Sequence, residues 1–159
     1  MKWQAENFHM YEQAKEYVDT ALIPLVPLKW GEEEKQTIIK GEYTSYLAEY
    51  LETQFTGRVF LMPSFTYLVV EQGEDKLKRL KQWDKHLVDN GFKHIIYITA
   101  DITWRTVASQ LPDELIWIPV STVESMDKTQ FRATIEQQAK ELMPIFTTKW
   151  QAVPKSREE

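Results

Sequence analysis

The chain of 159 residues contains no cysteine. This absence excludes disulfide bonds, zinc sites built on thiolates and cysteine nucleophiles, and it fits a reducing compartment. The sequence has only three histidines, His9, His86 and His94, and no two of them stand four residues apart. Because it also lacks a D-x-D-x-D-G calcium loop, we predict no bound metal.

Glycine is scarce as well, with five in the whole chain. None belongs to a G-x-G-x-x-G or G-x-x-x-x-G-K-[ST] motif, so the usual glycine cradle for a nucleotide is missing and no cofactor is predicted. Only a bare helix N-terminus could hold a phosphate. There is no G-x-S-x-G elbow either. Ser64 follows a predicted strand and remains open as a nucleophile, but we favour a turn residue because Pro63-Ser64 is common turn chemistry.

The sequence has no apolar run long enough to span a membrane, and residues 1–7 do not resemble a secretion signal. We therefore expect a cytoplasmic protein with no transmembrane segment. The net charge of −5 is mildly repulsive to nucleic acid, so no nucleic-acid partner is expected. A basic run from Lys76 to Lys85 could contact nucleic acid or phospholipid, but we favour a solvated helix face.

Aromatic residues are abundant, with six Trp, seven Tyr and seven Phe. Large aromatic side chains either fill a core or anchor an interface with a partner. We favour the core, since most aromatic area in proteins is buried. A contiguous exposed patch of Trp and Tyr side chains would support the interface interpretation, and fully buried aromatic residues would count against it.

Two kinds of apolar segment alternate along the chain. Short runs rich in β-branched and aromatic residues predict strands at 20–23, 58–62, 92–101 and 115–120. Apolar residues three and four apart predict helices at 7–18, 43–57, 74–90, 101–111 and from 127 onward. Asn7 is the expected N-cap of the first helix. Asp127 and Gln130 stand in capping-box spacing at the start of the last helix, whose inner face is predicted to include Phe131. This alternation predicts an α/β three-layer sandwich, flavodoxin- or Rossmann-like, with a mostly parallel sheet of four or five strands and a C-terminal helix. Residues 1–152 form a single domain in this prediction, and residues 153–159 form a frayed polar tail.

Three segments are harder to assign. Pro24 and Pro27 predict that the first strand ends near Ile23 or lies at an edge of the sheet, because proline cannot donate to a central ladder. Residues 29–42 are polar and predict a surface connection. Residues 67–71 stay open between a short hairpin strand and an irregular loop.

The run 92–101 is apolar through Ile98 without polar alternation, which is typical of a central strand covered on both faces, and it ends in Asp101. In open α/β sheets, ligands bind outside the carboxyl ends of the strands. Asp101 is therefore a candidate ligand-binding residue, although we favour a helix N-cap, and one carboxylate can do both. The other candidates on this predicted rim, a mixture of aromatic and polar side chains typical of a small-molecule cleft, are Lys29, Trp30, Ser64, Thr66, Tyr67, Thr99, Trp104 and Ser121. No catalytic residue is assigned.

Three stretches of the sequence resemble a known family: Tyr11–Leu25, Gly57–Tyr67 and Gly91–Ile95. They are similar to the YpiF-like proteins of low-GC Gram-positive bacteria, a small family of uncharacterised proteins, and the likeness covers nearly the whole chain. These stretches are structural signatures and bring no site residues with them. Genes of the family often lie near those for menaquinol–cytochrome c reductase, so the resemblance implies an accessory or regulatory role in respiration.

From these observations we expect a non-catalytic binding or regulatory domain that acts through a protein partner or through self-association. The alternative is a small-molecule-binding protein or enzyme with a cleft at the carboxyl ends of the strands. An exposed aromatic patch favours the first function. A deep pocket that holds a carboxyl group with a raised pKa favours the second.

Overall fold

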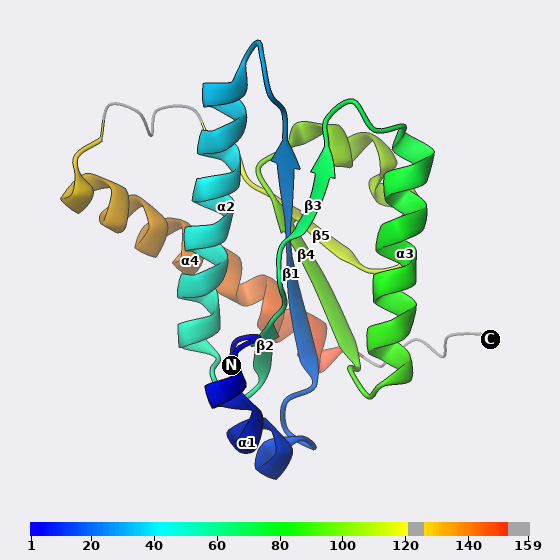
Figure 1. Ribbon diagram of the computed structural model, residues 1–159. Helices are drawn as coiled ribbons and strands as arrows, with labels where there is room; N and C mark the ends of the chain where they lie inside the picture. The colour runs from blue at the N-terminus through cyan, green and yellow to red at the C-terminus, as the bar shows by residue number, and fades with distance from the viewer. Residues whose placement is uncertain (121–125, 153–159) are drawn as a thin grey trace.

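A computed structural model describes residues 1–120 and 126–152. Along the chain the elements are α1 (Ala5–Ala14), β1 (Thr20–Leu28), α2 (Glu34–Gln54), β2 (Val59–Leu61), β3 (Phe65–Leu68), α3 (Gly73–Asp89), β4 (His94–Thr99), the 3₁₀ helix η1 (Ile102–Gln110), β5 (Glu114–Trp117) and α4 (Lys128–Gln151). The five strands form one all-parallel sheet between helices (Figure 1).

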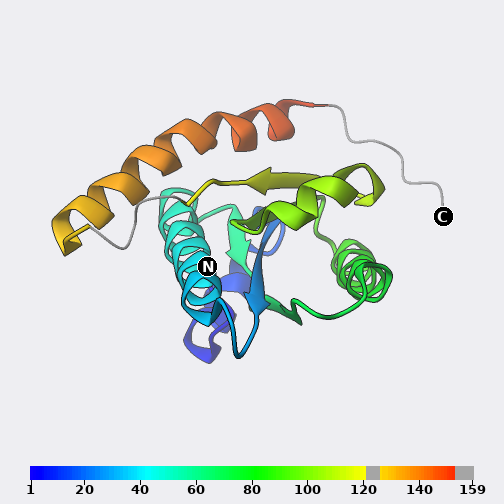
Figure 2. The same ribbon diagram turned by 90° about the horizontal axis from the view of Figure 1, so that it is seen from above.

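The strand order is β2–β1–β4–β5, and β3 lies on the same edge of β1 as β2. β2 pairs with the first residues of β1, and β3 pairs with the last four. The two short strands therefore act as one edge strand that is interrupted at residues 62–64. Helices α1, α3 and η1 pack on one face of the sheet, and α2 and α4 pack on the other. Figure 2 shows α2 and α3 on opposite sides of β1. The α/β three-layer fold predicted from the sequence is confirmed.

The sheet is buried on both faces, as continuous apolar strands require. All six residues of β4 are buried, which confirms the prediction of a covered central strand. Along β1, Ala21, Ile23 and Leu25 contribute to the core under α3, whereas Leu22 contributes to the core under α2. This alternation follows from the two-residue period of a strand.

The prediction for the first strand is wrong, because β1 continues through both prolines and lies between β4 and the interrupted edge. Along a strand, the backbone groups of successive residues point to opposite sides, so residues i and i+2 point the same way. The Leu22 carbonyl accepts a hydrogen bond from Met62 on the edge side, so Pro24 points the same way. There it faces the break between β2 and β3, where no ladder partner is required.

Pro27 points toward the opposite side of β1, the side of β4. Leu25 points the same way, and its carbonyl accepts a hydrogen bond from the Thr99 hydroxyl at 3.0 Å. β4 ends at Thr99. Because the register pairs Pro24 with Ile98, Pro27 lies beyond the last ladder position of β4. Each proline therefore stands where its missing N–H costs no hydrogen bond.

Residues 29–42 are not only a surface connection, because α2 already begins at Glu34. Gly41 lets this early part of the helix approach the sheet, since a Cβ atom at that position would lie 2.9 Å from Val26 Cγ1. The open question at residues 67–71 is also settled. Residues Phe65–Leu68 form β3, which is parallel to β1, and a turn follows.

Two of the described helices begin with a side-chain cap. Asp127 and Gln130 form the predicted capping box at the start of α4. Asp101 caps η1 by accepting a hydrogen bond from the Thr103 backbone. The predicted cap at Asn7 is wrong, because α1 begins two residues earlier, at Ala5. The Asn7 side chain accepts a hydrogen bond from the Lys2 backbone instead, at 3.2 Å.

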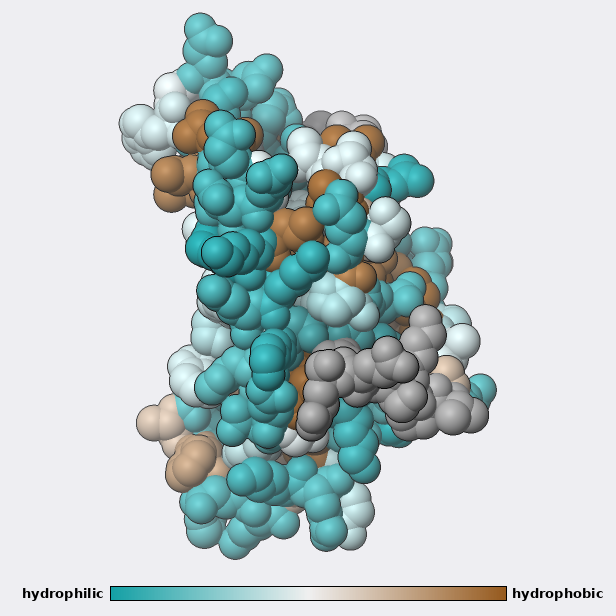
Figure 3. All heavy atoms as spheres, turned by 90° about the vertical axis from the view of Figure 1, so that its right-hand side faces the viewer, coloured by the Kyte–Doolittle hydropathy of each residue, from teal (hydrophilic) through white to brown (hydrophobic). Residues whose placement is uncertain are grey.

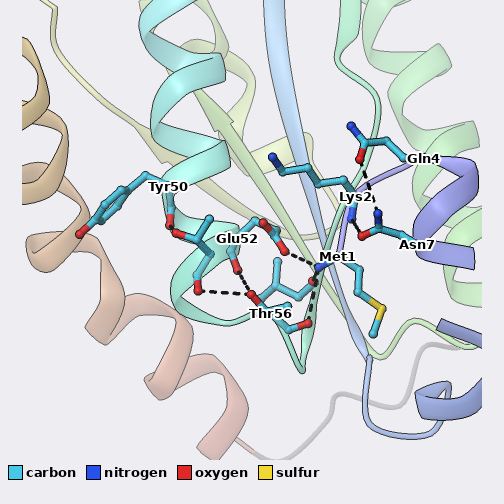
Figure 4. Close-up of polar contacts among 9 residues, drawn as sticks. Met1, Lys2, Gln4, Asn7, Tyr50, Glu52 and Thr56 are labelled. Atoms are coloured by element: carbon cyan, nitrogen blue, oxygen red, sulfur yellow. Dashed lines mark hydrogen bonds and ion pairs between the residues drawn. The ribbon is translucent and has the colours of Figure 1, made fainter. Parts of the chain in front are cut away.

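The amino group of Met1 is buried beside the C-terminal end of α2 (Figure 4). It lies 2.5 Å from Glu52 Oε1 and donates to the Val59 carbonyl at 2.9 Å. The Met1 carbonyl accepts from the Leu61 backbone at 2.7 Å. Lys2 forms an isolated parallel bridge with Leu61, so this segment covers the outer edge of β2.

Candidate functional site

The carboxyl ends of β1 and β4 form the topological switch point of the sheet. β1 is followed by α2 and then by β2, which lies on one side of β1. β3 is followed by α3, which packs on the opposite face of the sheet from α2, and then by β4, which lies on the other side of β1. Open α/β sheets bind their ligands at such points. Asp101 lies two residues beyond the end of β4, so the sequence placed it at the position where a ligand site is expected.

Asp101 is buried and its carboxylate is fully engaged within the protein. Its Oδ2 atom accepts a hydrogen bond of 2.6 Å from the Tyr67 hydroxyl. Its Oδ1 atom accepts two from Thr103, at 3.0 Å from the backbone N–H and at 2.8 Å from the hydroxyl. The Asp101 backbone N–H donates to the Thr99 hydroxyl at 3.0 Å. The carboxylate thus joins the end of β4, η1 and β3.

Lys76 completes this buried cluster from the first turn of α3. Its ammonium group lies 4.8 Å from the centre of the Tyr67 ring and 4.7 Å from the centre of the Trp104 ring. The two rings meet edge to face at 5.3 Å. Lys76 is buried, and Trp104 is completely so. Cation–π contacts of this kind strengthen when water is excluded.

The pKa values of the cluster follow from this geometry. Burial acts to raise the pKa of Asp101, but hydrogen bonds from Tyr67 and Thr103 and the charge of Lys76 outweigh it, so the pKa lies below the ordinary range. Burial, followed by the hydrogen bond to Asp101, raises the pKa of Tyr67. The cluster therefore contains a charged carboxylate that accepts from a neutral phenol. This is the opposite of the raised carboxyl pKa that would favour the small-molecule alternative.

The other predicted rim residues do not join the cluster. Ser64 and Thr66 are exposed at the interrupted edge, and Ser64 lines a small cavity of about 240 Å³ beside Lys2 and Pro24. Trp30 is 82% exposed in the loop after β1, and Lys29 forms an ion pair of 3.4 Å with Glu33. The candidate Ser121 lies outside the described residues. The structure thus brings together Tyr67, Thr99, Asp101 and Trp104. Among the described candidates, it leaves Lys29, Trp30, Ser64 and Thr66 apart.

An exposed hydrophobic surface surrounds this end of the sheet. We call it the apolar rim and define it by residues from the ends of β1 and β3, the first turns of α2 and the start of η1. Its members are Leu28, Trp30, Ile38, Leu68, Val69, Val70 and Ile102, each between 42% and 82% exposed. Leu28 and Leu68 are register partners on adjacent strands, so their side chains share one face. Figure 3 shows brown hydrophobic surface near the top of the molecule, at this end of the strands.

A larger cavity than the one beside Ser64 lies elsewhere, and it was not predicted from the sequence. It is a groove of about 790 Å³ between α2 and the first turns of α4, with Tyr43, Tyr46, Tyr50 and Phe131 among its lining residues. A signal was present in the sequence. The tyrosines at 43, 46 and 50 accompany Leu47 and Leu51 on one helix, so the apolar arc of α2 is wider than one core face requires.

Within residues 1–120 and 126–152, no three His, Asp or Glu side chains are grouped so that they could hold a metal ion. Within the same residues, no helix has the length and hydrophobicity needed to cross a bilayer.

Comparison with known proteins identifies relatives over nearly the whole chain. The profile of the family described as "Protein of unknown function (DUF2487)" matches residues 9–150. The "Uncharacterized protein YpiF" of Bacillus subtilis (strain 168) is 31% identical over 150 residues, which cover 94% of this chain and 98% of the relative. No solved structure matches the chain. These matches confirm the resemblance found in the sequence, and the chain belongs to the DUF2487 family.

Proposed function

We infer that the protein is a non-catalytic binding or regulatory protein of the cytoplasm, which acts through a protein partner or through self-association at the apolar rim. The observation that carries this proposal is the clustering of exposed hydrophobic side chains. Seven of the twelve large hydrophobic residues that are exposed in the described chain belong to the rim. A concentration of exposed hydrophobic side chains at one end of a monomer is a frequent mark of an interaction site.

The composition of the rim supports a protein as the bound molecule. Trp30 is the most exposed of its members, and tryptophan is enriched among the residues that contribute most to binding energy at protein interfaces. Beneath the rim, the Asp101 carboxylate accepts three hydrogen bonds from Tyr67 and Thr103. These bonds tie β3 and η1 to the end of β4 and stiffen the base of a contact surface. The family resemblance extends the proposal to an accessory role in respiration.

The proposal is tested with a double variant, Trp30→Ser with Leu68→Ser, that removes two rim side chains without touching the core. The matched control is Phe8→Ser with Tyr17→Ser, since both residues are more than half exposed near α1, at the opposite end of the molecule (Figure 1). Pull-down from native cytoplasm measures partner capture, and sedimentation velocity measures self-association. Wild type and control should behave alike, and the rim variant should lose the partner or the dimer. Equal capture and equal sedimentation by all three proteins would refute a role for the rim.

A second candidate function is suggested by the charged Asp101 at the switch point, where a small molecule would bind if the cluster opened. Thermal-shift measurements against nucleotides, flavins, quinone analogues and sugar phosphates test it. A ligand at a hundred times its dissociation constant adds about 2.7 kcal/mol of stability. A shift that disappears in Asp101→Asn would favour this second function over the first.

A further inference from the structure

The groove between α2 and α4 is separate from the apolar rim. It follows the outer side of α2 from Lys35 to Thr53, a length of roughly 27 Å at 1.5 Å per residue. In Figure 1 the first turns of α4 diverge from α2 on this side of the molecule. Its volume of about 790 Å³ lies in the range of small-molecule sites.

The walls of the groove are aromatic. Phe131 on α4 meets Tyr43 edge-on at 6.0 Å and Tyr46 edge-on at 5.4 Å. Tyr43 is buried, whereas Tyr46 is 47% exposed and Tyr50 is half-buried. The accessible tyrosine rings offer apolar faces with hydroxyl groups at their tips. Such a surface suits an apolar body that is flat or extended.

The groove also carries an excess of positive charge in a chain whose net charge is −5. Four cationic residues line it, Lys2, Lys35, Lys128 and Arg132, against the three acidic residues Glu42, Glu49 and Asp127. The Asp127 carboxylate is already used in the capping box of α4. Among the described residues, Lys128 and Arg132 have no acidic partner. They stand four residues apart on α4, so both flank Phe131 on the groove side.

We propose that this groove binds an anionic amphiphile, a small molecule with an apolar aromatic or acyl body and one acidic group. The apolar body lies against Tyr46, Tyr50 and Phe131, and the acidic group pairs with Lys128 and Arg132. Charge complementarity selects an anion over a neutral ligand of the same shape. The site does not depend on the function proposed for the apolar rim, because it uses a different side of α2.

The test compares two fluorescent probes of nearly the same shape. 8-Anilinonaphthalene-1-sulfonate carries one negative charge, and N-phenyl-1-naphthylamine is its neutral counterpart. Titration of the full chain with each probe gives two dissociation constants. Wild type should bind the anionic probe more tightly, and Lys128→Gln with Arg132→Gln should weaken that binding about tenfold while leaving the neutral probe unchanged. A titration with oleate that displaces the anionic probe would extend the result to acyl carboxylates.

Two control proteins make the result specific. Lys78→Gln with Lys81→Gln removes the same charge from exposed positions on α3 and should leave both dissociation constants unchanged. Leu68→Ser removes a rim residue and should also leave them unchanged, which separates the groove from the rim. The proposal is overturned if the α3 control weakens the anionic probe as much as the α4 variant does, if both probes bind wild type equally, or if Leu68→Ser abolishes binding.

Discussion

The hydrogen bond from Tyr67 to Asp101 gives the sharpest test of the buried cluster. Replacing Tyr67 with Phe keeps the ring that contacts Lys76 and Trp104 and removes only the hydroxyl group. Asp101 then keeps its two bonds from Thr103 but loses the third donor. A hydrogen bond to a charged group contributes about 1.5–3 kcal/mol, so we expect the free energy of unfolding to fall by about 2 kcal/mol at pH 7.

For a chain of this size, that loss corresponds to a melting temperature lower by about 4–8 °C. The effect should also depend on pH in a defined direction. The pKa of Asp101 is lowered in the folded protein, so its contribution is present above the unfolded pKa of about 3.9 and is lost as the pH falls through the folded value. The difference between Tyr67→Phe and wild type should therefore persist from pH 7 down to about pH 5 and shrink only as the pH falls further, through the folded pKa of Asp101.

Urea unfolding at a series of pH values measures this difference directly. Tyr17→Phe is the matched control, because Tyr17 is 67% exposed, and its change should stay within about 0.5 kcal/mol. A Tyr67→Phe protein as stable as wild type at pH 7 would refute the hydrogen bond as a stabilising contact. A destabilisation that is already lost between pH 7 and about pH 5 would contradict a charged carboxylate of lowered pKa as the partner of the hydroxyl.

Two further predictions concern the amino end of the sheet. Glu52→Gln removes the negative partner of the buried Met1 amino group. Breaking a buried ion pair should lower the free energy of unfolding by about 3–5 kcal/mol, which urea unfolding of protein that begins at Met1 measures. A loss below about 1 kcal/mol would contradict the buried pair. Burial, together with the charges of Lys149 and Arg58, lowers the pKa of His94 against the opposing effect of Asp19. As the pH falls, His94 therefore takes up a proton in the unfolded chain before it does so in the folded protein, and the free energy of unfolding should fall below about pH 6.5. His94→Gln should flatten this part of the plot of unfolding free energy against pH. An unchanged slope would refute the lowered pKa of His94.

The apolar rim and the groove can be tested independently because α2 contributes different faces to each. Ile38 belongs to the rim, whereas its neighbour Ile39 lines the groove. Adjacent helix residues point in directions about 100° apart. Variants at either surface therefore leave the other intact, and a protein that loses partner capture while keeping probe binding would establish two separate sites.

Several sequence predictions failed for reasons that depend on contacts distant in sequence. The two prolines of β1 suggested an edge, but Pro24 faces a break in the neighbouring strand and Pro27 extends beyond the end of β4. Neither the break in the neighbouring strand nor the end of β4 could be predicted before the strands that pair with β1 were known. The start of α2 was placed too late because its first turns are polar, and only the close approach of Gly41 to Val26 reveals that they pack on the sheet.

The candidate site shows the same division. The sequence located Asp101 at the end of a central strand and predicted its cap of η1, and both are properties of local residue order. It placed Tyr67 and Trp104 on the same rim as Asp101, but it did not indicate that Lys76 of α3 would lie against their two rings. The groove was missed for a related reason, since Phe131 was assigned to the inner face of its helix and its contact with Tyr46 depends on how α4 crosses α2.

The sequence by itself determined the alternation of strands and helices, the covered central strand, the caps at Asp101 and Asp127, and the family. These follow from hydrophobic period and short-range hydrogen bonding, which act over a few residues. Tertiary structure alone decided the strand order, the closing of the Asp101 cluster, the gathering of the apolar rim and the groove between α2 and α4. Each depends on which elements become neighbours, and that choice is made by the burial of the whole core at once.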